Sequence, residues 1–322
     1  MAVDTRCDLR PFRGAEDFPG MVRTFNARSE YEGGEDYVTV EQMSHNYEPG
    51  SRFDPGQDIV VAEVDGEIVG YGRTTWDEVA DDGRDYWVIA QSHPDFPGAL
   101  DQIADWVETR ARTVAAGHPP GNKYLAGWSD EAMSWASILR ERGYQQVRLS
   151  ATLVRPSLDD IPDRPLPEGV EVRPVEDTHL RTIWEADVEA FRDHWGYVEQ
   201  TDEDYEKWLG QPNWDPSLWR VGWAGEKVVG QVRSFIDEDE NRKLGALRGW
   251  TEDISTAREW RGRGIASGLI CSSLVALRER GMNEAALGVD TENVTGAFRL
   301  YQSLGYRLTR SHSFYRRVIE SA

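Results

Sequence analysis

The sequence of 322 residues has no apolar run near the ~20 residues that a membrane-spanning helix needs, and it has only two cysteines, Cys7 and Cys271. The first absence excludes a bundle of membrane helices. The second excludes a disulfide framework, because two distant cysteines form no motif. The first residues, "MAVDTRCDLRPF", also lack an apolar signal core, so we expect no targeting segment and a cytoplasmic location.

Positive charge is scarce as well. There are 36 Lys and Arg against 57 Asp and Glu, a net charge of −21, which argues against a nucleic-acid or anionic-membrane partner. The deficit is uneven: residues 1–150 carry −13, residues 151–250 carry −10, and residues 251–322 carry +2. An anion site is therefore best sought in the last segment. The six histidines show no metal-ligand spacing, so we expect no metal site.

Three stretches of the first half recur in the second half, in the same order and at offsets of 163, 160 and 162 residues. They begin at Asp8 and Glu171, at Val61 and Val221, and at Ile138 and Leu300. Such regularity indicates two copies of one domain. We expect a first domain over 1–155, a linker rich in Pro and Asp over 156–169, and a second domain over 170–322.

The second copy predicts a mixed α/β domain, with a twisted mixed sheet and helices on both faces. Apolar periodicity and turn residues give the order β-α-α-β-β-β-α-β-α-β. The expected strands are 170–174, 218–223, 228–235, "ALRGWTEDIST" and 284–290, with helices over 178–191, from about 264 to 280, and in "TGAFRLYQSL" before Gly305. "DEDENRK" at 237–243 is expected to be a turn.

The stretch "WRGRGIASG", residues 260–268, falls between a predicted strand and a predicted helix. A glycine-rich turn there exposes backbone N–H groups at the positive end of a helix dipole, which suits a phosphate. Arg261 and Arg263 add positive charge. The alternative is a tight turn with solvated arginines.

A longer pattern favours the anion site. Arg261-x-x-Gly264-x-Ala266 resembles the [Q/R]-x-x-G-x-[G/A] loop of the GCN5-related N-acetyltransferase (GNAT) superfamily, and "VDTENVTGAFRLYQSLGYR" resembles its next motif, a strand, an Asn and a helix ending in L-Y-x-x-L-G-[FY]. The resemblance covers residues 170–315 and, more weakly, 8–150. It implies two tandem GNAT-like domains and an acetyl-CoA-dependent N-acetyltransferase.

The resemblance also implies the residues that hold coenzyme A. Backbone groups of Ile254 and Thr256 would bond the pantetheine arm, Arg261 would stand at the loop entrance, and Asn293 would contact the arm. The pyrophosphate would lie on backbone N–H groups of the loop and first helical turn, at Gly262, Arg263, Gly264, Ile265, Ala266 and Ser267.

For catalysis, the resemblance implies Tyr301 as the general acid for the departing thiolate, with a core tyrosine as the alternative. An amine of pKa ~10 arrives protonated, so a carboxylate or a water chain must take its proton. Glu252 is the first candidate, because strand alternation puts it on the face of Ile254, whereas Asp253 should point away. The alternative for Glu252 is an ordinary strand carboxylate.

Acceptor recognition is expected in "FRDHWGYVEQ", through Asp193, His194, Trp195 and Tyr197, which suit a small amine that is cationic or aromatic. The alternative is that the two aromatic residues only pack. Two further functions stay open: a non-catalytic acyl-CoA-binding protein, and an enzyme that acetylates a protein or peptide.

The first copy looks degenerate at its phosphate loop. In "HPDFPGAL", Pro97 replaces the arginine and only Gly98 remains of the glycines, while Ile138 or Leu139 stands where the second copy has Tyr301. We expect cofactor binding only in the second copy. Since two copies in one chain already form a pseudo-dimer, we expect a monomer.

Overall fold

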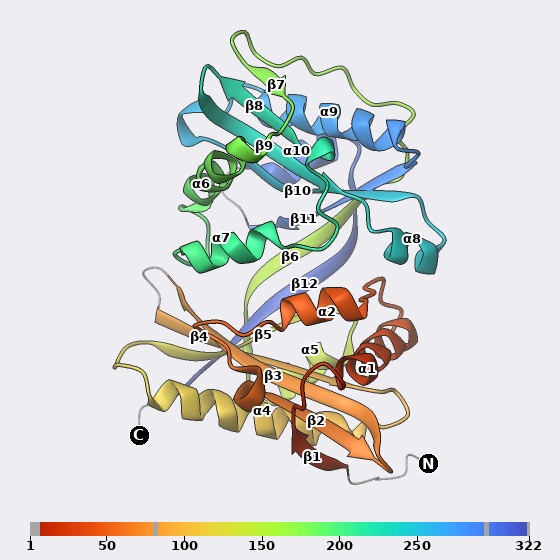
Figure 1. The fold of residues 1–322 in the computed structure, drawn as a ribbon, viewed down its shortest axis with the longest axis vertical. Coiled ribbons are helices and arrows are strands. Elements are labelled where there is room, and N and C mark those ends of the chain that lie inside the picture. The colour runs from red at the N-terminus through yellow and green to blue at the C-terminus, as the bar shows by residue number, and fades with distance from the viewer. Residues whose placement is uncertain (1–6, 80–82, 293–295, 321–322) are drawn as a thin grey trace. The chain divides into compact units, whose positions relative to one another are not determined.

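The computed structural model describes residues 7–79, 83–292 and 296–320, and confirms the mixed α/β class (Figure 1). The chain divides into two compact units. Unit 1 comprises Met1–Arg148 and His312–Ala322, and unit 2 comprises Leu149–Ser311. No helix in the described ranges is long and apolar enough to cross a membrane.

Unit 1 is a sheet in the strand order β1-β2-β3-β4-β5-β12, antiparallel except for the parallel pair β4–β5. Its core lies between this sheet and α4, whose apolar face is fully buried. In chain order, the elements of the first sequence repeat are β1 (Asp8–Pro11), α1 (Phe18–Tyr31), α2 (Val40–Asn46), α3 (Pro55–Asp58), β2 (Ile59–Val64), β3 (Glu67–Val79), β4 (Gly83–Ser92), α4 (Gly98–Ala116), β5 (Lys123–Asp130), α5 (Ser134–Glu141) and β6 (Gln145–Arg155).

Unit 2 has the strand order β6-β11-β10-β9-β8-β7, with β10 and β11 parallel. In chain order, the elements of the second sequence repeat are β7 (Glu171–Arg173), a 3₁₀ turn (Asp177–His179), α6 (Leu180–Phe191), α7 (Asp202–Leu209), a 3₁₀ turn (Pro216–Leu218), β8 (Arg220–Ala224), β9 (Lys227–Phe235), α8 (Glu238–Leu244), β10 (Arg248–Thr256), a 3₁₀ turn (Arg258–Trp260), α9 (Ile265–Glu279), β11 (Glu284–Asp290), α10 (Ala297–Ser303) and β12 (Arg307–Val318).

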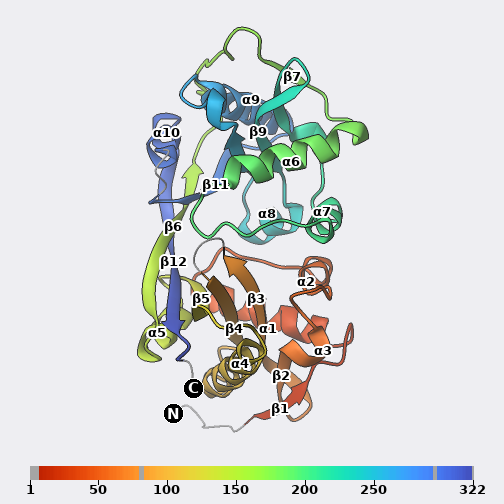
Figure 2. The ribbon, with the colours of Figure 1, turned by 90° about the vertical axis from the view of Figure 1, so that its left-hand side faces the viewer.

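Helices α6 and α9 cover opposite faces of β9 (Figure 2). Successive strand residues point to opposite faces. Accordingly, Gln231 donates to the carbonyl of Ile183 in α6, while neighbouring Gly230 lies against α9. A Cβ atom at Gly230 would come within 2.8 Å of Ile265, and one at Gly249 within 2.4 Å of Leu277, so these glycines let α9 pack closely on the sheet.

Strands β10 and β11 pair only briefly. The parallel ladder joins Arg248–Trp250 to residues 284–286, and no later pairs follow in the described part of these strands. The β9–β10 register also shifts by one residue between Glu252 and Ser255, and Asp253 there has a φ of +49°. The bulge and the parting of the strands open the sheet at the carboxyl end of β10.

The last strand of each sequence repeat pairs with the sheet of the other unit. Residues 150–155 of β6 pair antiparallel with β11, and residues 312–318 of β12 pair antiparallel with β5. The compact units therefore differ from the repeats, whose expected boundaries lie around the segment 156–169. The repeats are defined by similarity of sequence, which reflects common ancestry, whereas the compact units are defined by which strands lie together in the structure.

Two segments differ from the sequence-based expectation. Residues 237–243, expected as a turn, mostly form helix α8, because Asp237 caps it by accepting from the Glu240 N–H and Gly245 ends it at a φ of +65°. The segment 156–169, expected to bury little, buries Leu158 completely and packs Leu166 against α9.

Candidate active site

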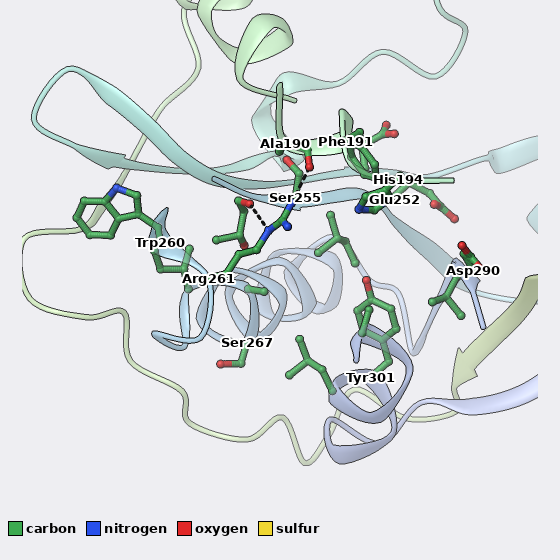
Figure 3. Close-up of a pocket in the computed structure, with 18 of the residues that line it drawn as sticks. Ala190, Phe191, His194, Glu252, Ser255, Trp260, Arg261, Ser267, Asp290 and Tyr301 are labelled. Carbon is green, nitrogen blue, oxygen red and sulfur yellow. Dashed lines mark hydrogen bonds between the residues drawn. The ribbon is translucent and has the colours of Figure 1, made fainter. Parts of the chain in front are cut away.

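A cavity of about 770 Å³ lies in unit 2 where β10 and β11 part (Figure 3). Its walls come from the end of α6, the second half of β10, the loop before α9, the first turn of α9, the end of β11, and α10. The lining residues are Ala190, Phe191, His194, Glu252, Asp253, Ile254, Ser255, Thr256, Trp260, Arg261, Gly262, Gly264, Ile265, Ala266, Ser267, Gly288, Val289, Asp290, Ala297, Leu300 and Tyr301.

The loop 257–264 forms one end of the cavity. Gly262 and Gly264 have φ values of +74° and +87°, a left-handed conformation that glycine adopts without steric cost. Gly264 is the N-cap of α9 and has no side chain to accept the first N–H groups of the helix. Those groups and the helix dipole therefore remain for an anion in the cavity. The equivalent linkage in unit 1, residues 93–97, is shorter and ends at Pro97.

The two arginines of the loop lie differently. Arg261 lines the cavity and its side chain is bonded to Asp193, Ala190 and Thr256. Arg263 is not among the lining residues, and its guanidinium lies 4.8 Å above the centre of the Trp260 ring. Arg263 thus holds the loop from outside by a cation–π contact.

Glu252 lies at the opposite end of the cavity from this loop. Its Oε1 accepts a hydrogen bond of 2.8 Å from the Gly288 N–H, across the gap between β10 and β11. Burial, and to a smaller extent the negative charge of Asp253, raise the pKa of Glu252 to about 8, although the hydrogen bond from Gly288 opposes them. A carboxyl group with such a pKa can exchange a proton near neutral pH.

Asp253 also lines the cavity, so the expectation that it points away is wrong. The cause is the bulge, which breaks strand alternation at this residue. Arg233 bonds Asp253 at 2.9 Å and Asp187 at 3.0 Å, and the Gln231 amide also donates to Asp187. Burial is the main cause that raises the pKa of Asp187, against the opposing charge of Arg233.

Tyr301 reaches the cavity from α10, with its hydroxyl directed inward (Figure 3). The residue is 6% exposed, and its ring packs edge-on against Tyr306. Burial, with a smaller contribution from the charge of Glu252, raises the pKa of Tyr301 above its ordinary value. The hydroxyl therefore stays protonated at neutral pH and can donate a hydrogen bond.

The four residues expected to recognise an acceptor are separated in the structure. His194 lines the cavity, while Asp193 is bonded to Arg261. Tyr197 lines an adjoining hollow of about 340 Å³, bounded by α6, α7 and β9, which shares Phe191 and Asp253 with the main cavity. Trp195 is 37% exposed and lines neither of the two.

Some lining residues were missed at the sequence level. Gly288, Val289 and Asp290 end β11, and their place opposite Glu252 follows from the parting of two strands, which no local pattern indicates. Asn293 lies outside the described residues. Within the described ranges, no group of three His, Cys, Asp or Glu is arranged to hold a metal ion.

The segment 180–306, which includes every described residue of the cavity wall, matches the acetyltransferase (GNAT) family model. The segment that holds the cavity is thus a GNAT acetyltransferase domain, and the protein is an acyltransferase.

Among curated proteins, the chain is 25% identical over 256 residues to a mycothiol acetyltransferase of Geodermatophilus obscurus, covering 78% of this chain and 79% of that one. It is 29% identical over 208 residues to the mycothiol acetyltransferase of Thermobispora bispora, covering 64% and 70%. Both alignments are longer than either expected domain of this chain, so the likeness extends over parts of both sequence repeats.

Among solved structures, a GCN5-related N-acetyltransferase from Sphaerobacter thermophilus superimposes with a TM-score of 0.72 at 25% identity, covering 98% of this chain and 96% of that one. A tandem GNAT protein from the clavulanic acid biosynthesis pathway superimposes with a TM-score of 0.67 at 13% identity, covering 98% and 100%. The second likeness concerns the fold alone.

Proposed function

We propose that the protein transfers an acetyl group from acetyl-CoA to a small primary amine, by direct attack while both substrates are bound in unit 2. The observation that carries the proposal is one cavity with an open helix N-terminus at one end and Glu252 and Tyr301 at the other. Acetyl transfer from acetyl-CoA requires a site that binds the pyrophosphate and groups that accept and donate protons at the thioester. The two ends of the cavity supply these two parts.

The walls of the cavity suit coenzyme A. Backbone N–H groups from Gly262 to Ser267 would hold the pyrophosphate, since the left-handed glycines let the backbone approach closely. The end of β10, at Ile254 and Thr256, has no ladder partner on its β11 side among the described pairs. Apart from the Thr256 carbonyl, which accepts from Arg261, its backbone groups are therefore available to an amide-bearing arm. Bound acetyl-CoA supplies an activated acyl group.

Glu252 acts as the base in this proposal. It faces the cavity and has no cationic partner among its described contacts, so its carboxylate is not already committed to a salt bridge. With a pKa of about 8 it accepts a proton more readily than an ordinary carboxylate, and gives it up to water near the same pH. His194 also lines the cavity and can pass the proton on.

Tyr301 acts as the acid. Its O–H stays protonated at neutral pH and points into the cavity, so it can donate to the sulfur as the thiolate leaves. The pKa of the Tyr301 hydroxyl lies above that of an ordinary thiol, about 8.5, so the proton stays closer to the tyrosine oxygen than to the sulfur. The hydrogen bond from Tyr301 therefore supplies most of the stabilisation of the leaving thiolate.

The acceptor is proposed to enter from the adjoining hollow. Asp187, Asp204 and Asp253 outnumber Lys207 and Arg233 among its lining residues, which favours an amine over an acid. The rings of Trp184, Phe191, Tyr197 and Trp208 also line it, which suits a compact molecule with apolar surface. The name of the relatives, mycothiol acetyltransferase, supports a small acceptor over a protein.

The first experiment is calorimetric titration of the protein with acetyl-CoA, followed by a thiol-release assay with a panel of small amines and of peptides. Saturable binding with amine-dependent release of CoA supports the proposal. Release only with peptides would move the acceptor class to proteins, and binding without release for any amine would leave an acyl-CoA-binding protein. Absence of binding would contradict the proposal altogether.

A further inference from the structure

The side chain of Arg261 is committed to protein groups. Its Nη1 donates to Oδ2 of Asp193 at 2.7 Å and its Nη2 to Oδ1 at 3.1 Å, a bidentate pair. Nη2 also donates to the Ala190 carbonyl at 2.8 Å, and Nε to the Thr256 carbonyl at 3.2 Å. Four hydrogen bonds leave little of the guanidinium for a phosphate.

These bonds tie together three backbone segments that are distant in sequence. Ala190 and Asp193 lie at the end of α6, Thr256 is the last residue of β10, and Arg261 stands in the loop itself. Arg258 adds a second, longer contact to Asp193 at 3.4 Å. The loop that precedes α9 is therefore fastened to α6 on one side and to β10 on the other (Figure 3).

The loop needs such fastening because its glycines have no side chains that could pack against the protein. An added Cβ atom at Gly262 would meet nothing within 4 Å, and one at Gly264 only Ser267 Oγ at 3.8 Å. Glycine-rich backbone loses much conformational entropy when it is fixed. If that entropy is lost before the ligand arrives, the ligand binds more tightly.

We propose that Asp193 is a positioning residue, which acts through Arg261 to hold the loop 257–264 in the conformation that binds acyl-CoA. This inference rests on the proposed function. It assigns Asp193 to the cofactor side of the cavity, and so replaces the acceptor-binding role expected from the sequence. The hydrogen bonds from Arg261 lower the pKa of Asp193, so the pair stays charged across the neutral range.

The test compares Asp193→Ala with the unsubstituted protein in binding and in catalysis. The pair is partly exposed, so we expect Kd for acetyl-CoA to rise about three- to tenfold. We expect kcat at saturating acetyl-CoA and KM for the amine to change less than twofold. Arg261→Gln should weaken acetyl-CoA binding by a similar factor. The double variant Asp193→Ala, Arg261→Gln should bind no more weakly than either single variant, because each single change already removes the Asp193–Arg261 ion pair.

Asp215→Ala is the matched control. Asp215 bonds Arg280 at 3.0 Å with similar exposure, but Arg280 lies at the far end of α9, about 22 Å along the helix from the loop. This variant should leave Kd for acetyl-CoA unchanged. Asp193→Glu should recover part of the affinity that Asp193→Ala loses.

Three results would overturn the proposal. The first is tighter binding of acetyl-CoA by Asp193→Ala, which would mean that Asp193 competes with the phosphate for Arg261. The second is an unchanged Kd for acetyl-CoA, and the third is a rise confined to KM for the amine. If the unsubstituted protein binds no acetyl-CoA, the proposed function fails, and amide hydrogen exchange over 257–268 still tests the fastening: Asp193→Ala must speed exchange there and Asp215→Ala must not.

Discussion

Two adjacent carboxylates at the bulge of β10 have different environments. Asp253 is bonded to Arg233, whereas Glu252 accepts from the Gly288 N–H, faces the cavity and has no ion pair with any residue that the structure describes. The same bulge that turns Asp253 toward Arg233 leaves its charge beside Glu252, and this charge adds to burial in raising the pKa of Glu252. A backbone irregularity of one residue thus sets the pH range in which the site can accept a proton.

Asp253→Asn should move the pH profile of kcat/KM to lower pH. In the unsubstituted protein the profile should rise with pH through about 8, as Glu252 loses its proton. Removing the neighbouring charge lowers the pKa of Glu252 and so moves the rise downward. Using the same amine in both assays cancels the titration of the acceptor, and an unmoved midpoint would contradict the role of Asp253.

Glu252→Gln should stabilise the fold at alkaline pH while it lowers activity. Between the ordinary pKa of 4.5 and about 8, folded Glu252 keeps a proton that the unfolded chain has lost. The free energy of unfolding therefore falls as pH rises through this window, and glutamine removes the fall. The melting temperature of the variant, relative to the unsubstituted protein, should be higher at pH 8 than at pH 5. An equal difference at both values would show that the pKa of Glu252 is not raised.

Tyr301→Phe should lower kcat about a hundredfold and leave Kd for acetyl-CoA nearly unchanged, because it removes only the donor to the leaving sulfur. Tyr306→Phe is the control. Tyr306 is equally buried and packs on Tyr301, but its hydroxyl bonds Thr251 and it does not line the cavity. Equal losses of kcat in both variants would point to packing, and the acid role would be wrong.

At the scale of elements, the parallel strands part in both units. β4 and β5 pair over four residues, as β10 and β11 pair over three. In unit 1 the buried guanidinium of Arg28 donates to the Ala90 carbonyl near the end of β4 and to Ser134 at the start of α5. The ends of β10 and the start of α10 are where the cavity of unit 2 lies. In unit 1 an arginine thus bridges β4 and α5, the counterparts of the elements β10 and α10 that bound the cavity in unit 2.

Titration with acetyl-CoA should accordingly give one site per chain. Arg28 joins the end of β4 to the start of α5. In addition, the short linkage before α4 has Pro97, which lacks a backbone N–H, at the place where unit 2 has Arg261. Calorimetry at several protein concentrations measures the number of sites per chain, and Gly264→Pro should abolish acetyl-CoA binding. Two sites per chain would contradict the view that unit 1 has lost the ligand.

Gly264→Ala should weaken acetyl-CoA binding severalfold, because a left-handed φ costs a residue with a Cβ about 1–2 kcal/mol and the loop relaxes away from it. Gly281→Ala is the control at the other end of α9: Gly281 has a φ of +86°, also in open space. Both variants should lose similar stability in denaturant, and only Gly264→Ala should lose affinity. Equal affinities would mean that the loop conformation does not matter for binding.

At the scale of the whole molecule, the two repeats exchange their last strands. Tyr315 of β12 is buried in the core of unit 1, where its hydroxyl accepts a bond from Arg140. In return, residues 150–155 complete the sheet of unit 2 beside β11. Neither repeat therefore contains all the strands of one compact unit.

A fragment of residues 149–311 should fold better than the second repeat, 170–322. The longer segment keeps the β6 residues that pair with β11 and the buried Leu158, both of which the repeat lacks. Circular dichroism melts and acetyl-CoA titration of the two fragments measure the difference. Equal stability would mean that the exchanged strand contributes little to unit 2.

The sequence was sufficient for the fold class, the repeat and the family, because these depend on local periodicity and on one contiguous motif around Gly264. It was insufficient where distant residues decide. Asp193 and Arg261 are 68 residues apart, so their pairing has no local pattern. Alternation failed at Asp253 because a bulge depends on the neighbouring strand, and "DEDENRK" contains residues common to turns and to helix starts.

The exchange of strands has a consequence for how such a gene can change. Deleting the first repeat would remove β6 and leave the edge of β11 bare, and deleting the second would remove β12 and uncover β5. Mutations can erode the ligand site of the first repeat one residue at a time, but the repeat itself cannot be discarded. The two repeats must be retained together, because each supplies one strand to the sheet formed mainly by the other.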